Sequence, residues 1–489
     1  MSVVDALLLG TAVGAVFGVL PIVGATLGLV VVYPFLDSFQ HIPYVGAVFL
    51  ISLVASSSVS DTVSSVLLGI PGANSSSASI MDGFPLAQRG YGHLALVVAV
   101  IASVVNGCLW IGVAAVAYSP LAALALNVFI PDFLYIYVLS FLLIAYVASD
   151  QPVLSFIALC IGGFIGLIGL DSAGAPRFTF GWPYLEDGVQ IAPLVAGLFG
   201  FPELLGLKNG QGGAQFRLKT RFSLGRLLAL GLRLNWRFRA DGLRGGLIGA
   251  GIGILPGIGG AIADWLAYSQ TILLNPKERF GNGNLRGLVG CEGANNSHKA
   301  TALVPTLVFG IPGAPYAAIL IAYFSILGFD VGSYEFVADR KFFELSYGSF
   351  LFATILGGAI CLVTVRWIAR IRSLGRLTMF ILVGPLLLYA CVQYTGNIDD
   401  YIILLCFTIL GISCKILNIP RICILFSFII IERLEKTILQ YFSIYGWNEM
   451  FNGAPRWLLF CCVVVVSVLI LRKSLDPKVR IKLVNGSRS

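Results

Sequence analysis

Ionisable and amide side chains interrupt an apolar stretch in the second half of the chain. The segment CEGANNSHKATALVP, residues 291–305, contains Glu292, Asn295, Asn296 and Lys299. Charged groups are costly inside a membrane and usually serve a function there. Lys299 is therefore a candidate for binding a substrate carboxylate. The alternatives are an ion pair with Glu292 or a shallow position with the ammonium at the surface. Asn295 and Asn296 are candidates for contacts with substrate or cation, or for hydrogen bonds between helices.

A second polar stretch, SSSVSDTVSS at residues 56–65, lies in the first half of the chain. Its acid, Asp61, is a candidate for coupling to a proton or to Na+, and a helix cap or a structural ion pair is the alternative. Asp264 and Glu292 are further candidates of the same type. We expect no cofactor beyond the coupling ion, which would be Na+ or H+.

The motif Gly-Ile-Pro-Gly-Ala occurs twice, at residues 69–73 and 310–314. Proline removes a backbone donor and clashes with the preceding turn, and glycine favours non-helical dihedral angles. A helix must therefore break at both places. Broken backbone is tolerated inside a membrane only where protein or a water-filled cavity surrounds it. The alternative reading is a pair of kinks that only shape helix packing.

A helix break exposes helix ends, whose free N–H groups and partial positive charge attract anions. Each motif is flanked by polar side chains that add hydroxyl, amide or ammonium groups. The predicted substrate site comprises the glycines and prolines of both motifs and these neighbours: Gly69, Pro71, Gly72, Asn74, Ser75, Ser76, Asn295, Asn296, Lys299, Gly310, Pro312 and Gly313.

The length of the segment before the second break predicts a re-entrant hairpin. Residues 295–309 would form a helix about 22 Å long at 1.5 Å per residue, whereas the hydrocarbon core is about 30 Å thick. Such a piece cannot cross the membrane alone. The first copy, over residues 44–82, has the same plan.

The composition defines the elements that must position these residues. Of the 489 residues, 57% are hydrophobic and 11% are charged, against about 25% charged in soluble domains. The ten cysteines include no CxxC pair, which argues against a disulfide or zinc framework. The net charge is +8, and the Lys and Arg residues lie in clusters along the sequence. We interpret these clusters as cytoplasmic loops rather than as a nucleic-acid surface.

The apolar runs predict an all-α polytopic membrane protein with about 11 full crossings and two re-entrant hairpins. A Lys- and Arg-rich connector and the C-terminal tail are placed on the cytoplasmic side. Five crossings before an inside connector place the N-terminus outside. The predicted crossings are 6–32, 92–118, 133–149, 152–170, 190–207, 243–272, 347–366, 377–395, 400–415, 420–437 and 456–472.

Two stretches of similar sequence indicate an internal duplication. GAVFGVLPIVGA at residues 14–25 matches GAGIGILPGIGG at residues 249–260, offset by 235, and the two break motifs are offset by 241. With an odd number of crossings before the connector, the repeats are inverted. The predicted domains are a first repeat, a basic cytoplasmic connector, a second repeat and a cytoplasmic tail: 1–207, 208–244, 245–472 and 473–489.

These motifs resemble the large membrane subunit, of the TctA type, of the tripartite tricarboxylate transporter family. The resemblance covers nearly the whole chain and rests on GILPGIGG, EGANN, LVPTLVFGIPGAP, LLGIPGANSSSASIMDGFPLAQRG and SAGAPRFTFGWPYLEDG. It implies a permease of a bacterial-type inner membrane, driven by an ion gradient, that takes up citrate-like carboxylates. Its partners would be a small four-helix membrane subunit and a periplasmic solute-binding protein.

A docking patch for that binding protein is expected in an outer loop, with anchoring in lipid headgroups as the alternative for its two aromatic residues. The patch comprises Trp182, Tyr184, Glu186 and Asp187.

Other functions remain as alternatives. A stand-alone carboxylate carrier would need no binding protein. An intramembrane enzyme is a further alternative, through Ser297 and Lys299, although residues two apart face different sides of a helix. No Lys follows a Gly, so the chain has no Walker A motif, and its three histidines form no HExxH. We therefore expect a transporter and not an enzyme.

Overall fold

The protein is described here from a computed structural model. The described residues are 1–21, 23–125, 130–148, 151–171, 174–206, 223–255, 260–368, 376–392, 397–444 and 454–475.

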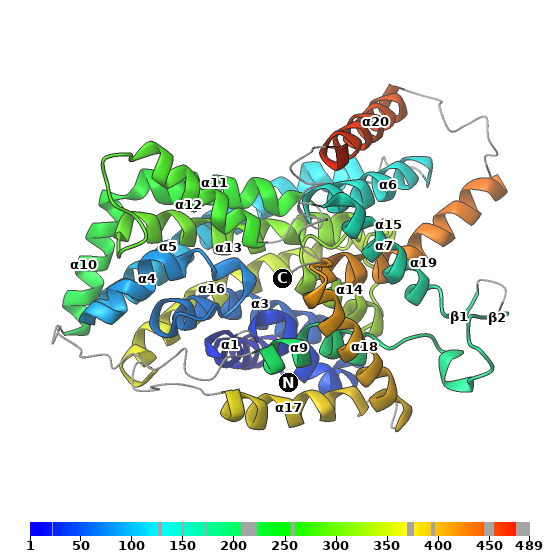
Figure 1. Cartoon of the computed structure of the whole chain (residues 1–489), viewed down its shortest axis with the longest axis horizontal. Coiled ribbons are helices and arrows are strands. Elements are labelled where there is room, and N and C mark those ends of the chain that lie inside the picture. Colours follow the sequence, from blue (N-terminus) through cyan, green and yellow to red (C-terminus); the bar gives the residue numbers. More distant parts are fainter. Residues whose placement is uncertain are drawn as a thin grey trace. The chain divides into compact units, whose positions relative to one another are not determined.

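Nearly all of these residues lie in helices, which confirms the predicted all-α class (Figure 1). The strands form one antiparallel hairpin, β1 (Gly169–Leu170) with β2 (Pro176–Arg177). The α-helices are α1 (Val3–Val19), α2 (Gly24–Val32), α3 (Pro43–Leu68), α4 (Ser79–Leu86), α5 (Gly92–Ala125), α6 (Ile130–Val147), α7 (Pro152–Gly166), α8 (Ile191–Val195), α9 (Phe201–Gly206), α10 (Leu224–Arg237), α11 (Arg239–Ile254), α12 (Gly260–Leu274), α13 (Leu285–Phe309), α14 (Pro315–Ile326), α15 (Tyr334–Ala338), α16 (Arg340–Ile368), α17 (Arg376–Val392), α18 (Asp399–Ile416), α19 (Arg421–Ile444) and α20 (Ala454–Leu475).

The chain forms two compact units. One comprises residues 1–122, 200–255 and 259–396, and the other comprises 123–199, 256–258 and 397–489. These boundaries differ from those of the predicted repeats, because each half of the sequence contributes to both units.

The second unit contains α6, α7 and α18 to α20, with α7 packed along α19 and α6 along α20. Arg177 on β2 forms an ion pair with Glu435 on α19. In the predicted docking patch, Tyr184 hydrogen-bonds to Asp400 and Trp182 donates to Asp399 at 3.3 Å. Two of the four patch residues are thus engaged within this unit, while Glu186 and Asp187 are exposed.

In the first unit, glycines let α1 lie against α3 and α11 lie against α13. The close contacts recur at the same positions in both pairs, at the offsets found in the sequence. They are Gly10 with Phe49, Gly14 with Leu53, Gly245 with Gly290 and Gly249 with Ala294.

Two predicted crossings are wrong as continuous helices. Residues 6–32 form α1 and α2, which are separated near Pro21. Gly24 there has a φ of 51°, a left-handed conformation that favours glycine. Residues 243–272 likewise divide into α11 and α12, and residues 256–259 between them lie outside the described part. Helix α11 begins at Arg239, inside the predicted connector 208–244, which stays a prediction.

The length argument for a re-entrant hairpin is also wrong. The helix before the second break, α13, begins at Leu285 because Asn284 caps it by accepting from the Arg286 N–H at 2.9 Å. Its 25 residues extend about 37 Å, enough to cross the hydrocarbon core. The first arm, α3, has 26 residues. Re-entrant hairpins therefore stay a prediction without this support.

Among the described residues, three helices are long and apolar enough to cross a membrane, Pro43–Leu68, Ser79–Ala123 and Arg340–Thr364. The predicted crossing count and the inversion of the repeats stay predictions.

The tight packing of α11 on α13 can be tested with two glycines of one helix. A Cβ on Gly249 would lie 2.7 Å from the Ala294 Cα, whereas a Cβ on Gly251 would meet nothing within 4 Å. We expect Gly249→Ala to destabilise the protein by about 2 kcal/mol. Gly251→Ala should instead stabilise it by about 0.5–1 kcal/mol through helix propensity. Unfolding of the purified variants in detergent measures both, and equal stability of the two would contradict the packing.

Candidate functional site

The two Gly-Ile-Pro-Gly motifs form helix breaks of the same geometry. Helix α3 ends at Gly69, with φ and ψ of 68° and 21°, and α13 ends at Gly310, with 65° and 24°. Both are left-handed conformations that favour glycine. In each motif, the N–H of the second glycine donates to the hydroxyl group of a residue seven positions earlier. Gly72 donates to Ser65 at 3.4 Å, and Gly313 donates to Thr306 at 3.3 Å.

The backbone N–H groups at the first break were predicted to be free, but in the structure they donate hydrogen bonds within the chain. Besides the Gly72 N–H, the Ala73 N–H donates to Ser76 at 3.3 Å, and the Ala78 N–H donates to the Asp264 carboxylate at 2.6 Å. The segment after the break therefore does bind a carboxylate in this structure, but it is one of the chain's own.

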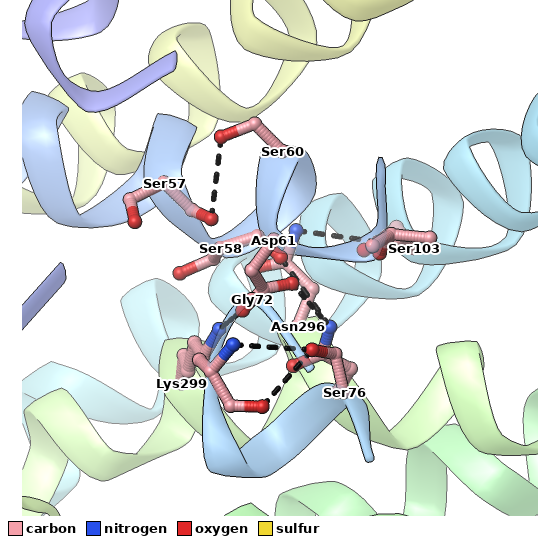
Figure 2. Close-up of polar contacts among 12 residues, drawn as sticks. Ser57, Ser58, Ser60, Asp61, Gly72, Ser76, Ser103, Asn296 and Lys299 are labelled. Carbon is pink, nitrogen blue, oxygen red and sulfur yellow. Dashed lines mark hydrogen bonds and ion pairs between the residues drawn. The ribbon is translucent and has the colours of Figure 1, made fainter. Parts of the chain in front are cut away.

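A buried ion pair joins the two broken helices. The Lys299 Nζ on α13 lies 2.5 Å from the Asp61 Oδ2 on α3, and their side chains are 5% and 1% exposed. Asn295 donates to the other oxygen of Asp61 at 3.0 Å. Lys299 thus neither pairs with Glu292 nor reaches the surface, which were the two structural alternatives considered from the sequence. Figure 2 shows Asp61, Lys299, Gly72 and Ser76 gathered at the first break.

Glu292 has partners of its own. Thr62 on α3 donates to its Oε2 at 2.8 Å, and Ser79 on α4 donates to its Oε1 at 2.5 Å. This carboxylate therefore ties α13 to the helices on both sides of the first break. It lies fully buried, where these hydrogen bonds offset part of the cost of desolvation.

Several buried polar atoms on α12, on α13 and just after the first break have no hydrogen-bond partner in the described part of the chain. The N-terminus of α12 is one meeting point, because a Cβ on Gly260 would contact Ser75 and would lie 3.2 Å from the His298 Nδ1. Buried polar groups normally have partners, so unpaired ones point to a ligand or to water. The unpaired atoms are Ser75 Oγ, Asp264 Oδ1, Asn295 Oδ1, Asn296 Oδ1, and Nδ1 and Nε2 of His298.

The structure thus brings together most of the predicted site around the first break. The residues gathered there are Asp61, Gly72, Ser75, Ser76, Asp264, Glu292, Asn295 and Lys299, while Asn296 donates to the Ser103 carbonyl on α5 at 3.3 Å.

The second break is attached less directly. Gly313 packs against Ala302, and Tyr316, just after the break, donates to the Lys299 carbonyl at 3.0 Å. Among the described residues, no hydrogen bond joins the backbone of Gly310, Pro312 or Gly313 to a charged side chain, and the Gly313 N–H donates to Thr306 instead. The side chain of Asn74 lies outside the described part.

Three residues at the site were not singled out from the sequence, namely Thr62, Ser79 and His298. The hydroxyl groups had a signal, because an apolar helix seldom carries so many serines and threonines without partners for them. His298 stood inside a quoted motif but had no predicted role.

The described residues contain no group of three or more His, Cys, Asp or Glu side chains that could hold a metal ion. The charge at the site is supplied by the chain's own ammonium and carboxylates. Buried charges beside a helix break, in a chain of apolar helices, are typical of helical membrane transport proteins.

Comparison with known families agrees with this class. Residues 5–426 match the model of the tripartite tricarboxylate transporter TctA family. The chain belongs to this family, and the earlier resemblance is confirmed. No solved structure matches it.

Two curated relatives come from Agrobacterium vitis. An uncharacterised 52.8 kDa protein in the TAR-I ttuC' 3' region is 29% identical over 327 residues, which are 66% of this chain and 64% of that protein. An uncharacterised protein in the TAR-II ttuC' 3' region is 37% identical over 86 residues, 17% of this chain and 35% of that protein. The match thus spans less than two thirds of the length of either relative.

The ion pair can be tested with a double-mutant cycle. Lys299→Met and Asp61→Asn each leave one polar partner buried without its counterpart, and we expect the first to cost about 3–5 kcal/mol. The double variant should cost less than the sum of the two single variants, by at least about 1 kcal/mol. Unfolding of the purified proteins in sodium-free detergent buffer measures the cycle. Additive losses would show that the two side chains do not interact.

Proposed function

We propose that this chain is the permease subunit of a tripartite transporter and imports an organic dicarboxylate or tricarboxylate, driven by an ion gradient. Family membership supports a role in transport. The observation that carries the substrate class is the buried Lys299 ammonium, placed beside a helix break and beside unpaired polar atoms.

The pairing with Asp61 suggests how a carboxylate would be bound. Lys299 holds one carboxylate already, so its position and geometry suit a second one that competes for the same ammonium. Ser75 and His298 offer further hydrogen-bonding atoms close by. A substrate that displaces Asp61 from Lys299 would loosen the contact between α3 and α13. We propose that this loosening is how substrate binding promotes the conformational change that moves the site's access from one side of the membrane to the other.

The partners follow from the same proposal. A periplasmic solute-binding protein would capture the substrate and dock on the outer side, at the predicted patch, of which Glu186 and Asp187 are exposed to solvent. A small four-helix subunit would complete the membrane complex. The membrane would be a bacterial inner membrane, with the N-terminus outside and the C-terminus in the cytoplasm.

Reconstitution tests the proposed function. Vesicles that contain this chain and its small subunit should take up labelled carboxylate under an ion gradient, and at low substrate concentration only when the binding protein is present outside. Binding-protein-independent uptake at the same rate would instead identify a stand-alone carrier. Absence of gradient-driven carboxylate uptake under every condition would contradict the proposal.

The same vesicles can test whether the second break belongs to the transport path. A Cβ on Gly313 would lie 2.9 Å from the Ala302 Cβ, whereas one on Gly384 would meet only Phe380, at 3.8 Å. Gly313→Val should therefore reduce uptake at least about tenfold, an effect of about 1.4 kcal/mol, while Gly384→Val serves as the matched control. Uptake rates are normalised to the amount of protein in the membrane.

A further inference from the structure

The surroundings of Asp61 resemble a binding site for a monovalent cation. Its carboxylate is buried, and Ser58 and Asn295 lie next to it, since Asn295 donates both to Asp61 and to the Ser58 carbonyl, at 3.0 and 3.4 Å. The Asn295 Oδ1 has no partner among the described residues. Carboxylate, carbonyl and amide oxygens are the ligands that hard cations prefer.

The position of such a cation is occupied by a side chain. The Lys299 ammonium approaches Asp61 to 2.5 Å and is itself almost completely buried. The other two acids nearby are engaged elsewhere, Glu292 with Thr62 and Ser79, and Asp264 with the Ala78 N–H. Lys299 is therefore committed to Asp61 rather than shared among the carboxylates.

Charge balance then argues against a second cation at this place. The pair of Asp61 and Lys299 is already neutral, so an added Na+ would meet a compensated carboxylate and would be repelled by the ammonium that lies 2.5 Å from that carboxylate. Removal of the ammonium would reverse the situation, because a bare carboxylate with neighbouring oxygen atoms would remain.

We propose that Lys299 acts as a built-in cation, and that its ammonium takes the place beside Asp61 that Na+ would otherwise occupy. The inference rests on the proposed transport function only in treating this place as a coupling site. The binding claim itself concerns the folded chain and needs no transport activity.

The repeated sequence supplies a natural replacement for the lysine. At the offset of 241 residues that relates the two breaks, Ser58 is the counterpart of Lys299. Lys299→Ser therefore removes the ammonium with a residue that the other repeat already carries at this position. Lys299→Met keeps more of the side-chain volume and serves as the second variant.

The test measures the thermal unfolding midpoint, Tm, of purified protein in detergent at pH 8.5. Each protein is heated in NaCl, KCl or choline chloride at equal ionic strength. The set comprises the wild-type chain, Lys299→Met, Lys299→Ser, the double variant Asp61→Asn with Lys299→Met, and Lys436→Ala. Lys436 pairs with Glu432 on the exposed surface of α19, so Lys436→Ala controls for the loss of one lysine.

We expect NaCl, compared with choline chloride, to raise the Tm of Lys299→Met and of Lys299→Ser by at least about 2 °C. The wild-type chain, the double variant and Lys436→Ala should shift by less than about 0.5 °C. The Asp61→Asn change matters because it removes the carboxylate while leaving the lysine substitution in place.

Two results would overturn the inference. A Na+ response of the wild-type chain as large as that of the Lys299 variants would show that the ammonium does not exclude the ion. If NaCl raises the Tm of neither Lys299 variant, while the double variant is folded and gives the reference Tm, the place beside Asp61 is no cation site. Carboxylate uptake in the reconstituted vesicles is measured separately, so failure of this inference and failure of the proposed transport function are distinguishable.

Discussion

A charge buried among apolar helices must have a partner of opposite sign, and this requirement organises the centre of the first unit. Asp61 and Lys299 satisfy it for each other across 238 positions of sequence, which fixes α3 against α13. Asn295 then bonds the second oxygen of Asp61, and Glu292 finds Thr62 and Ser79 instead of the lysine. These three carboxylate and amide side chains and the ammonium thus have the partners that offset their desolvation, whereas the Asn295 Oδ1 remains without one among the described residues. The arrangement therefore depends on a single strong interaction, which a substrate carboxylate could also make.

The helix breaks and the ion pair depend on each other. A break is tolerated inside a membrane protein when its backbone groups are satisfied, and hydroxyl groups at Ser65 and Thr306 do this at equivalent positions of the two halves. The glycines that follow pack on the backbone of the preceding helix, Gly72 against Asp61 and Gly313 against Ala302. The first break thus touches the residue that holds Lys299. Movement at the break and exchange of the lysine's partner would be coupled, which is the property a carrier needs.

The sequence predicted what is local and missed what is distant. Proline and glycine act on their own turn, so the breaks at Gly69 and Gly310 were predictable, as was the helical class. The partner of Lys299 was not, because nothing near residue 299 indicates that the chain returns with Asp61. The donors after the first break were expected to be free, but Asp264, almost 190 residues away, binds one of them. The sequence analysis began the helix before the second break at residue 295, whereas α13 begins at Leu285, after the capping residue Asn284.

The central claim is that a substrate carboxylate binds at the Lys299 ammonium beside the first break. An experimental structure of the chain in lipid, determined with the carboxylate that the proposed binding protein carries, tests this most directly. We predict ligand density within hydrogen-bonding distance of the Lys299 Nζ, with Asp61 withdrawn from it and Ser75 or His298 in contact. A carboxylate bound entirely within the unit of residues 123–199 and 397–489, with the Asp61 to Lys299 pair intact, would contradict the account.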